Sequence, residues 1–362
     1  MNTVVARVNE QPSLSSAQMS RAVPVLIGLA SVAVAILLTV AGGGFRWGWV
    51  FILSGLIYVV AIAIVARVVE DRRQSTDRVM RTVITLAFIG VLVPLASVFW
   101  TVITEGVSRF DSIFLSETMR MSPESMLAQL DGGVAGGAYH AMVGTLIVTG
   151  VSGMIAVPIG VLTAIYLVEF GTGRLASTVT RMVDVMTGIP SIVAGLFAYA
   201  LFELFLGPGT RSGLSGGVAL SLLMAPVVIR SSEEMLRLVP NELREASYAL
   251  GVPKWKTILK VVLPTAIAGI LTGVTLSVAR VIGETAPLLV TVGLAQDTNY
   301  NPLDGRMTTL PVYTYYQYVQ PGLPTEAGHA RAWAAAMMLV IIVAALFTLA
   351  RILSWALKPK GL

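Results

Sequence analysis

Long apolar runs dominate this sequence and limit what it can fold into. A helix that crosses the hydrocarbon core of a bilayer needs about 20 mostly apolar residues. We expect eight membrane-spanning helices, at Val23–Val40, Trp47–Ala66, Val83–Ile103, Met142–Val168, Met182–Leu206, Leu214–Ile229, Val261–Val292 and Ala334–Trp355. The seventh run contains Arg280, Glu284 and Pro287, so we interpret it as a helix, a break and a short partial helix. The predicted fold class is an all-α polytopic membrane protein.

The composition supports a membrane protein and excludes several other classes. Of the 362 residues, 55% are hydrophobic and only 12% are charged, whereas soluble domains average about 25% charged residues. The formal net charge of +5 is spread between apolar runs, so it predicts no nucleic-acid partner. The sequence has no cysteine, which excludes disulfides and cysteine nucleophiles. Two histidines, His140 and His329, leave little for a metal site.

The orientation of the spans follows from where lysine and arginine gather, because cytoplasmic loops carry the excess of these residues. Basic residues concentrate after the second, fourth and sixth runs and in the tail, whereas the segment after the third run is rich in acids. We therefore predict that both termini are cytoplasmic. We do not interpret the first run as a cleaved signal peptide, because a second span follows it at once.

The expected organisation has four parts. Residues 1–75 form a cytoplasmic N-terminus and an extra transmembrane hairpin, which the charged linker Arg67–Arg81 separates from the rest. Residues 76–137 hold a leading transmembrane helix and an external segment, and residues 138–356 form the main membrane core. Residues 357–362 are a cytoplasmic tail.

One predicted cytoplasmic segment, Asn241–Pro264, has strong local signals. Asn241 is a candidate N-cap, and Leu243, Ala246 and Leu250 make one apolar stripe at helical spacing. Gly251 can end this helix in the left-handed conformation, and Pro253 suits the start of the next. We expect a short helix, a sharp corner and a second helix that enters the membrane. Many loops contain such an amphipathic connector, so the pattern alone does not assign a function.

Charged residues inside spans are functional candidates because each costs about 3 kcal/mol at mid-bilayer. Arg280 and Glu284 lie four residues apart and share a face if the helix persists between them; they could form a neutralising ion pair or bind an oxyanion. Arg230 could instead reach the cytoplasmic interface. The acids Asp184 and Glu203 lie near the ends of the fifth run, where each could reach an interface. Candidate hinge positions are Pro190, Pro226, Pro253, Pro264 and Pro287.

The spacing within Asn241–Pro264 resembles the EAA motif of ABC importer permeases. Glu245-Ala246-Ser247, three residues, Gly251, nine residues, Val261, one residue and Leu263-Pro264 match it, with Ser247 and Val261 as departures. In that family the motif forms a coupling helix, here residues 241–260, which sits in a groove of the ATPase subunit. The resemblance implies that Glu245, Ala246, Ser247, Leu250 and Gly251 contact the ATPase. The chain contains no GxxxxGK[ST] sequence, so we expect a pore-forming subunit that is not itself an enzyme.

A second stretch of sequence resembles one particular type of ABC importer permease. Arg280 to Leu289 reads RVIGETAPLL and looks like the RxxGETAPLL signature of PstA-type permeases of phosphate ABC transporters, which have a type I, MetI-like fold. Further matches lie at Pro190–Leu196, Pro226–Arg230 and Ala249–Lys256. The resemblance extends from about Val83 to the C-terminus and leaves out the first two spans. It implies that Arg280 and Arg230 lie on the phosphate path, with Glu284 as a partner of Arg280.

The resemblance implies half of the pore of an ATP-driven phosphate importer in a bacterial cytoplasmic membrane. The implied partners are a PstC-type sister permease, an ATPase dimer, an external phosphate-binding protein, inorganic phosphate and the lipid bilayer. No cofactor is expected on this chain, since ATP and Mg would bind the ATPase. One alternative is a sulfate or molybdate ABC permease. Another is a proton-coupled secondary transporter that uses Glu284, against which the lack of an internal repeat counts.

Overall fold

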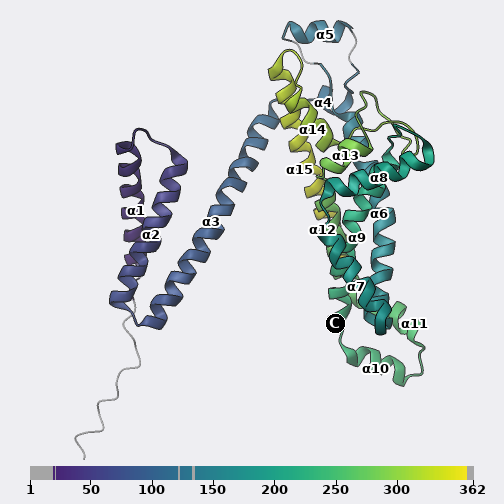
Figure 1. The fold of residues 1–362 in the computed structure, drawn as a ribbon, viewed down its shortest axis with the longest axis horizontal. Helices are drawn as coiled ribbons and strands as arrows, with labels where there is room; N and C mark the ends of the chain where they lie inside the picture. Colours follow the sequence, from purple (N-terminus) through teal and green to yellow (C-terminus); the bar gives the residue numbers. More distant parts are fainter. Residues whose placement is uncertain (1–18, 21, 121–122, 133–134, 357–362) are drawn as a thin grey trace, which may run out of the picture. The chain divides into compact units, whose positions relative to one another are not determined.

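The computed structural model describes residues 19–20, 22–120, 123–132 and 135–356, and these form helices and connecting loops without a β-strand (Figure 1). The helices are α1 (Ala22–Ala41), α2 (Trp47–Val69), α3 (Arg72–Val107), α4 (Ser112–Ser116), α5 (Pro123–Leu130), α6 (Tyr139–Ile165), α7 (Gly173–Thr187), α8 (Ser191–Leu206), α9 (Gly213–Arg237), α10 (Asn241–Ala249), α11 (Lys254–Thr257), α12 (Leu263–Val281), α13 (Ala286–Thr291), α14 (Leu310–Val319) and α15 (Thr325–Ala356). Two π-helical turns, η2 (Tyr166–Phe170) and η3 (Ile258–Val262), extend α6 and lead into α12.

The described part of the chain contains seven helices long and apolar enough to cross a membrane, and an eighth crossing if the bent pair α7–α8 counts as one. This agrees with the predicted all-α fold and its eight spans. The fifth predicted span is wrong in form, however. Met182–Leu206 is not one helix, because α7 and α8 meet at an angle of 107°. Gly188, Ile189 and Pro190 separate them, and proline cannot continue the hydrogen-bonding pattern of a preceding helix.

The structure divides into two compact units, residues Met1–Phe99 and Trp100–Leu362. In the first unit, α1 and α2 form a hairpin closed by Gly43 and Gly44, both with positive φ. The boundary lies within α3, whereas the sequence places it at residue 75. Within the charged linker Arg67–Arg81, Glu70 and Asp71 separate α2 from α3, and the other residues are helical. Arginine and glutamine are good helix formers, and Arg78 Nε donates to Glu70 Oε2 at 2.9 Å, which fixes the turn.

The second unit is built around α6, α9 and α12. Small residues let these helices approach closely, as is typical of helix packing in membranes. A Cβ added to Gly160 of α6 would lie 2.6 Å from Val228 Cγ1 of α9. The core between them contains Val148, Leu220, Met224 and Val281, each at most 1% exposed.

The helices of the second unit have a defined direction (Figure 1). The first two turns of α6 lie at the end that carries α14, where Thr145 Oγ1 accepts a hydrogen bond from Leu310 N at 2.7 Å. Helix α9 begins at the same end, because Ser212 N, directly before α9, donates to Thr291 O of α13. The opposite end of α9 leads to α10. We call these the α14 end and the α10 end. Since α6 and α9 both run from the α14 end to the α10 end, α7 and α8 together return the chain across the bundle.

Buried polar contacts hold the segment that precedes α6 at the α14 end. Asp111 accepts a hydrogen bond from Phe114 N at 2.8 Å and caps α4, and it also pairs with Arg109. Burial raises the pKa of the Asp111 carboxyl, but the Phe114 N–H and the Arg109 guanidinium outweigh it and hold the pKa below its usual value. Arg331 of α15, 2% exposed, donates to Ala135 O at 3.2 Å.

Candidate coupling helix and substrate path

Helix α10 is the short helix that the sequence predicts in Asn241–Pro264, but it begins differently. Pro240 occupies the N-cap position, and no side chain caps the helix. Asn241 is therefore the first helical residue and not the N-cap. Glu242 lies in the first turn, where the helix dipole favours an acid.

A closed corner follows α10. Gly251 has φ of +74°, and its N–H donates to Tyr248 O at 2.9 Å, so it ends the helix in the left-handed conformation that glycine adopts without strain. Across the corner, the hydroxyl groups of Ser247 and Thr257 lie 2.8 Å apart and share a hydrogen bond. Pro253 is the N-cap of α11. These contacts join α10 and α11 into one stiff unit.

A buried salt bridge fastens α10 to the bundle. Arg244 Nε and Nη2 donate to Glu169 Oε1 of η2 at 3.1 and 3.0 Å, and the two side chains are 12% and 5% exposed. Arg244 also donates to two carbonyl oxygens at the end of α9, Leu236 O at 3.0 Å and Val239 O at 2.6 Å. Arg244 therefore ties α10 to both α6 and α9. Sequence reasoning missed Glu169, because 75 residues separate the partners.

The remaining face of α10 is open. Glu245 and Ala246 are exposed, Leu250 is 84% exposed, and Ser247 is 8% exposed because it turns inward to Thr257. Beyond the corner, Trp255 is 61% exposed. Four of the five predicted coupling residues (Glu245, Ala246, Leu250 and Gly251) are exposed, whereas Ser247 supports the corner.

A π-helical turn links α11 to the long helix α12. The turn, η3, ends at Val262, and Pro264 follows in the first turn of α12. Proline inside a regular α-helix loses a hydrogen bond and clashes with the carbonyl four residues earlier; the wider turn accommodates it. The chain therefore passes from corner to span in one continuous helical path.

The seventh predicted span breaks as expected, between Val281 and Ala286. Arg280 lies in the last turn of α12 and Glu284 within the break, so the two do not share a helical face. The expected pairing of Glu284 with Arg280 is wrong. No hydrogen bond or ion pair joins the exposed Arg280 side chain to any described residue. Arg280 is a free cation in the described part of the chain.

Helix α13 is wedged into the bundle beside this break. A Cβ added to Gly195 of α8 would lie 2.5 Å from Pro287 Cα, so the two backbones touch. Ser215 Oγ of α9 donates to Thr291 O at 3.1 Å. Because α8 and α9 both hold α13, a movement of α12 relative to α13 must be absorbed in the break that contains Glu284.

Arg230, in contrast, lies within a network of acids. It pairs with Asp184 of α7 and, at 2.8 Å, with Glu233 one turn along α9; Glu233 also accepts from Arg237 at 2.7 Å. The Arg230 side chain remains 32% exposed. The sequence shows Asp184 only as an isolated charge near a span end, because the pair is separated by 46 residues.

The two candidate path arginines lie at different levels of the bundle. Gly273 of α12 packs against Ser231, the neighbour of Arg230. Arg280 follows Gly273 by seven residues, about 10 Å at the rise of an α-helix. Since α12 runs from the α10 end, Arg280 lies nearer the α14 end and Arg230 nearer the α10 end. Pro226, the remaining hinge candidate, is buried inside an unbroken α9.

Comparison with known proteins places the chain in a family. The family described as the inner membrane component of binding-protein-dependent transport systems matches residues 156–360, more than half of the chain. The chain is 46% identical over 281 residues (78% of this chain and 89% of the relative) to the phosphate transport system permease protein PstA 1 of Mycobacterium tuberculosis. It is 38% identical over 277 residues (75% and 93%) to the permease protein PstA of Pasteurella multocida. Among solved structures, the inward-facing MetNI methionine ABC transporter is similar with a TM-score of 0.48 and 22% identity, covering 66% of this chain and 100% of that chain. The sequence relationship shows that this chain belongs to the family of binding-protein-dependent inner-membrane transport components, and within it to the PstA-type permeases.

Proposed function

We propose that this chain is the transmembrane permease subunit of an ATP-driven phosphate importer and forms half of its pore. The observation that carries the proposal is the match to phosphate permeases over 78% of the chain, which includes the exposed, unpaired Arg280. A planar guanidinium donates two parallel hydrogen bonds to a tetrahedral oxyanion and keeps its charge. Relatives named for phosphate favour this anion over sulfate or molybdate.

The ATPase would act through α10. Its exposed face offers small and apolar side chains around Glu245, which suits close docking against a basic partner. Two contacts hold α10 rigidly against the bundle: the hydrogen bond between Ser247 and Thr257 and the bridge between Arg244 and Glu169. A rigid α10 can act as a lever. Movement of the ATPase dimer would therefore be transmitted to α6, α9 and α12 together.

Phosphate would meet the two arginines in sequence. Arg280, nearer the α14 end, would bind it first. Arg230 would bind it second, with phosphate competing against Asp184 for the same guanidinium. Two weak sites in series suit transport, because the ion must also leave. Glu284, in the break beside Arg280, would set how tightly the anion is held.

The rest of the assembly is inferred from the family. A PstC-type permease would complete the pore, an ATPase dimer carrying ATP and Mg would dock at the α10 end, and a phosphate-binding protein would dock at the α14 end. The chain would span the bacterial inner membrane with both termini in the cytoplasm. The basic residues that gather after the second, fourth and sixth apolar runs of the sequence support this orientation.

Transport by an Arg280→Gln variant tests the substrate path. The change removes the charge and keeps a shorter polar side chain, so assembly should be unaffected. Charged hydrogen bonds contribute about 1.5–3 kcal/mol, which predicts a fall in phosphate uptake of roughly 10- to 100-fold. The matched control is Arg67→Gln, which removes an exposed arginine of α2 in the first unit and should transport normally. Wild-type uptake by Arg280→Gln would remove Arg280 from the path.

A further inference from the structure

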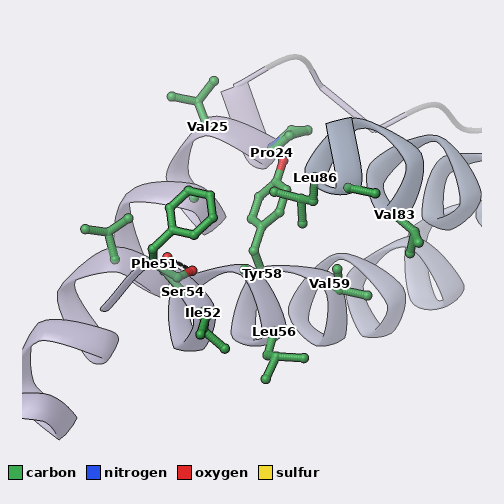
Figure 2. A pocket seen from close by; sticks show the side chains of 14 residues that line it. Pro24, Val25, Phe51, Ile52, Ser54, Leu56, Tyr58, Val59, Val83 and Leu86 are labelled. Carbon is green, nitrogen blue, oxygen red and sulfur yellow. Dashed lines mark hydrogen bonds between the residues drawn. The ribbon is translucent and has the colours of Figure 1, made fainter. Parts of the chain in front are cut away.

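The first unit contains an apolar groove that its own side chains do not fill. The groove has a volume of about 650 Å³ and is lined by α1, α2 and the first half of α3. Figure 2 shows Tyr58 of α2 standing between Pro24 of α1 and Leu86 of α3, with Phe51 further along the groove. The walls are almost entirely carbon. In a bilayer such a groove is occupied, since an empty one would lose its dispersion contacts.

A second cavity, of about 750 Å³, adjoins the first and has the opposite character. Pro24 and Tyr58 line both cavities, so apolar groove and polar cavity meet at these side chains. The second cavity lies where α2 turns into α3, and five of its ten lining residues are charged. Together the two spaces are apolar along their length and charged at one end.

The charged end carries more cationic than anionic side chains. Its wall carries Arg73, Arg78 and Arg81 against Glu70 and Asp77. Glu70, whose side chain is 1% exposed, is fully engaged by Arg78 and by a backbone N–H at 2.9 Å. Arg81 has only a loose contact of 3.4 Å with Asp77, and both side chains are more than two-thirds exposed; such surface pairs contribute little.

Arg73 gives the wall of the second cavity its net positive charge. No hydrogen bond or ion pair joins its exposed side chain to a described residue. Arg73 and Arg81 are therefore available to an anion that enters the cavity, while the pair of Arg78 and Glu70 gives the wall its shape.

We propose that this composite groove is a binding site for an anionic phospholipid, with the phosphate of the headgroup at Arg73 and Arg81 and an acyl chain beside Phe51 and Tyr58. A polar cavity joined to an apolar groove matches the two parts of a phospholipid. Basic pockets at the ends of membrane helices bind anionic headgroups, and each arginine contributes about 1 kcal/mol. A lipid held there fixes the α1–α2 hairpin against α3 within the first unit. The proposal is independent of the transported ion.

Native mass spectrometry of the full-length chain in detergent, titrated with phosphatidylglycerol and with phosphatidylcholine, tests the site. We expect phosphatidylglycerol to bind preferentially. The double variant Arg73→Gln with Arg81→Gln should weaken its binding about 30-fold. The control, Arg174→Gln with Arg181→Gln, removes two exposed arginines from α7 and should leave binding unchanged. Equal binding of the two lipids, or binding unaffected by the double variant, would overturn the proposal.

A groove-filling variant tests the acyl chain separately. Nothing lies within 4 Å of a Cβ added to Gly55, which lines the groove, so Gly55→Leu should fold and occupy the space. We expect it to weaken phosphatidylglycerol binding while the arginines remain. Glycerol 3-phosphate, which has the headgroup phosphate without chains, should not compete. Competition by glycerol 3-phosphate, or crosslinking of a photoreactive residue at Leu56 to another protein subunit instead of to lipid, would contradict a phospholipid site.

Discussion

The buried bridge between Glu169 and Arg244 makes the attachment of α10 testable in isolation. In a Glu169→Ala variant, the Arg244 guanidinium stays at 12% exposure without its carboxylate. Breaking a buried pair can cost about 3–5 kcal/mol. Arg244 keeps its carbonyl acceptors at the end of α9, Leu236 O and Val239 O, so we expect about 2–3 kcal/mol, nearer the cost of a charged hydrogen bond.

That free energy should appear as local opening of α10. A loss of about 2–3 kcal/mol raises the opening equilibrium roughly 30- to 150-fold. Hydrogen exchange of the α10 amides, measured by mass spectrometry on the assembled complex, should accelerate by this factor, while α15 exchanges as in the wild type. Arg244→Ala should have a larger effect, because it also removes the hydrogen bonds to Leu236 O and Val239 O. Adding Glu169→Ala to it should change little, because the bridge is then already lost.

A matched control removes a carboxylate elsewhere. Glu326, in the first turn of α15, is exposed, so Glu326→Ala should leave α10 exchange unchanged. If α10 in Glu169→Ala exchanged within about twofold of the wild type, the bridge would not be what holds α10 to the bundle. The lever mechanism would then lose its main support.

Three further predictions concern other parts of the molecule. Glu245→Arg should leave the chain in the membrane but abolish stimulation of the ATPase by phosphate-loaded binding protein; normal stimulation would refute docking on α10. Gly195→Ala forces a Cβ to 2.5 Å from Pro287 Cα and should destabilise the complex by about 1–3 kcal/mol in thermal unfolding, whereas Gly150→Ala, with nothing within 4 Å, should not; equal unfolding midpoints would contradict the close approach. The lowered pKa of Asp111 means that its charge stabilises the fold above the unfolded pKa of about 4 and that this contribution is lost as pH falls through the folded pKa. Asp111→Asn should therefore be less stable than wild type at pH 7, with a difference that shrinks below about pH 4; a difference constant with pH would exclude this role.

The sequence carries enough local information to predict the helices and the corner after α10. Gly251 and Pro253 end one helix and begin the next by their own backbone restrictions, and Pro287 with the charged Arg280 and Glu284 predicts the break in the seventh span. These features depend on neighbours in the chain. Their predicted and observed positions agree because only residues close in the sequence determine them.

Other features depend on contacts between distant residues, and the sequence did not predict them. Pro190 was a candidate hinge, but the 107° angle between α7 and α8 was not predicted, because hydropathy does not distinguish one straight span from two helices. The ion pairs of Arg244 and Arg230 join residues 75 and 46 positions apart. The expected pair of Arg280 with Glu284 failed because the helix on which the spacing argument relied ends at Val281.

Phosphate uptake into proteoliposomes tests the central claim most directly. The chain would be reconstituted with its sister permease and ATPase, with ATP inside and radiolabelled phosphate plus binding protein outside. The account predicts saturable uptake that requires ATP and is not reduced by excess sulfate or molybdate. Uptake without ATP or without the ATPase, or uptake that sulfate suppresses, would contradict a phosphate-specific permease driven through α10.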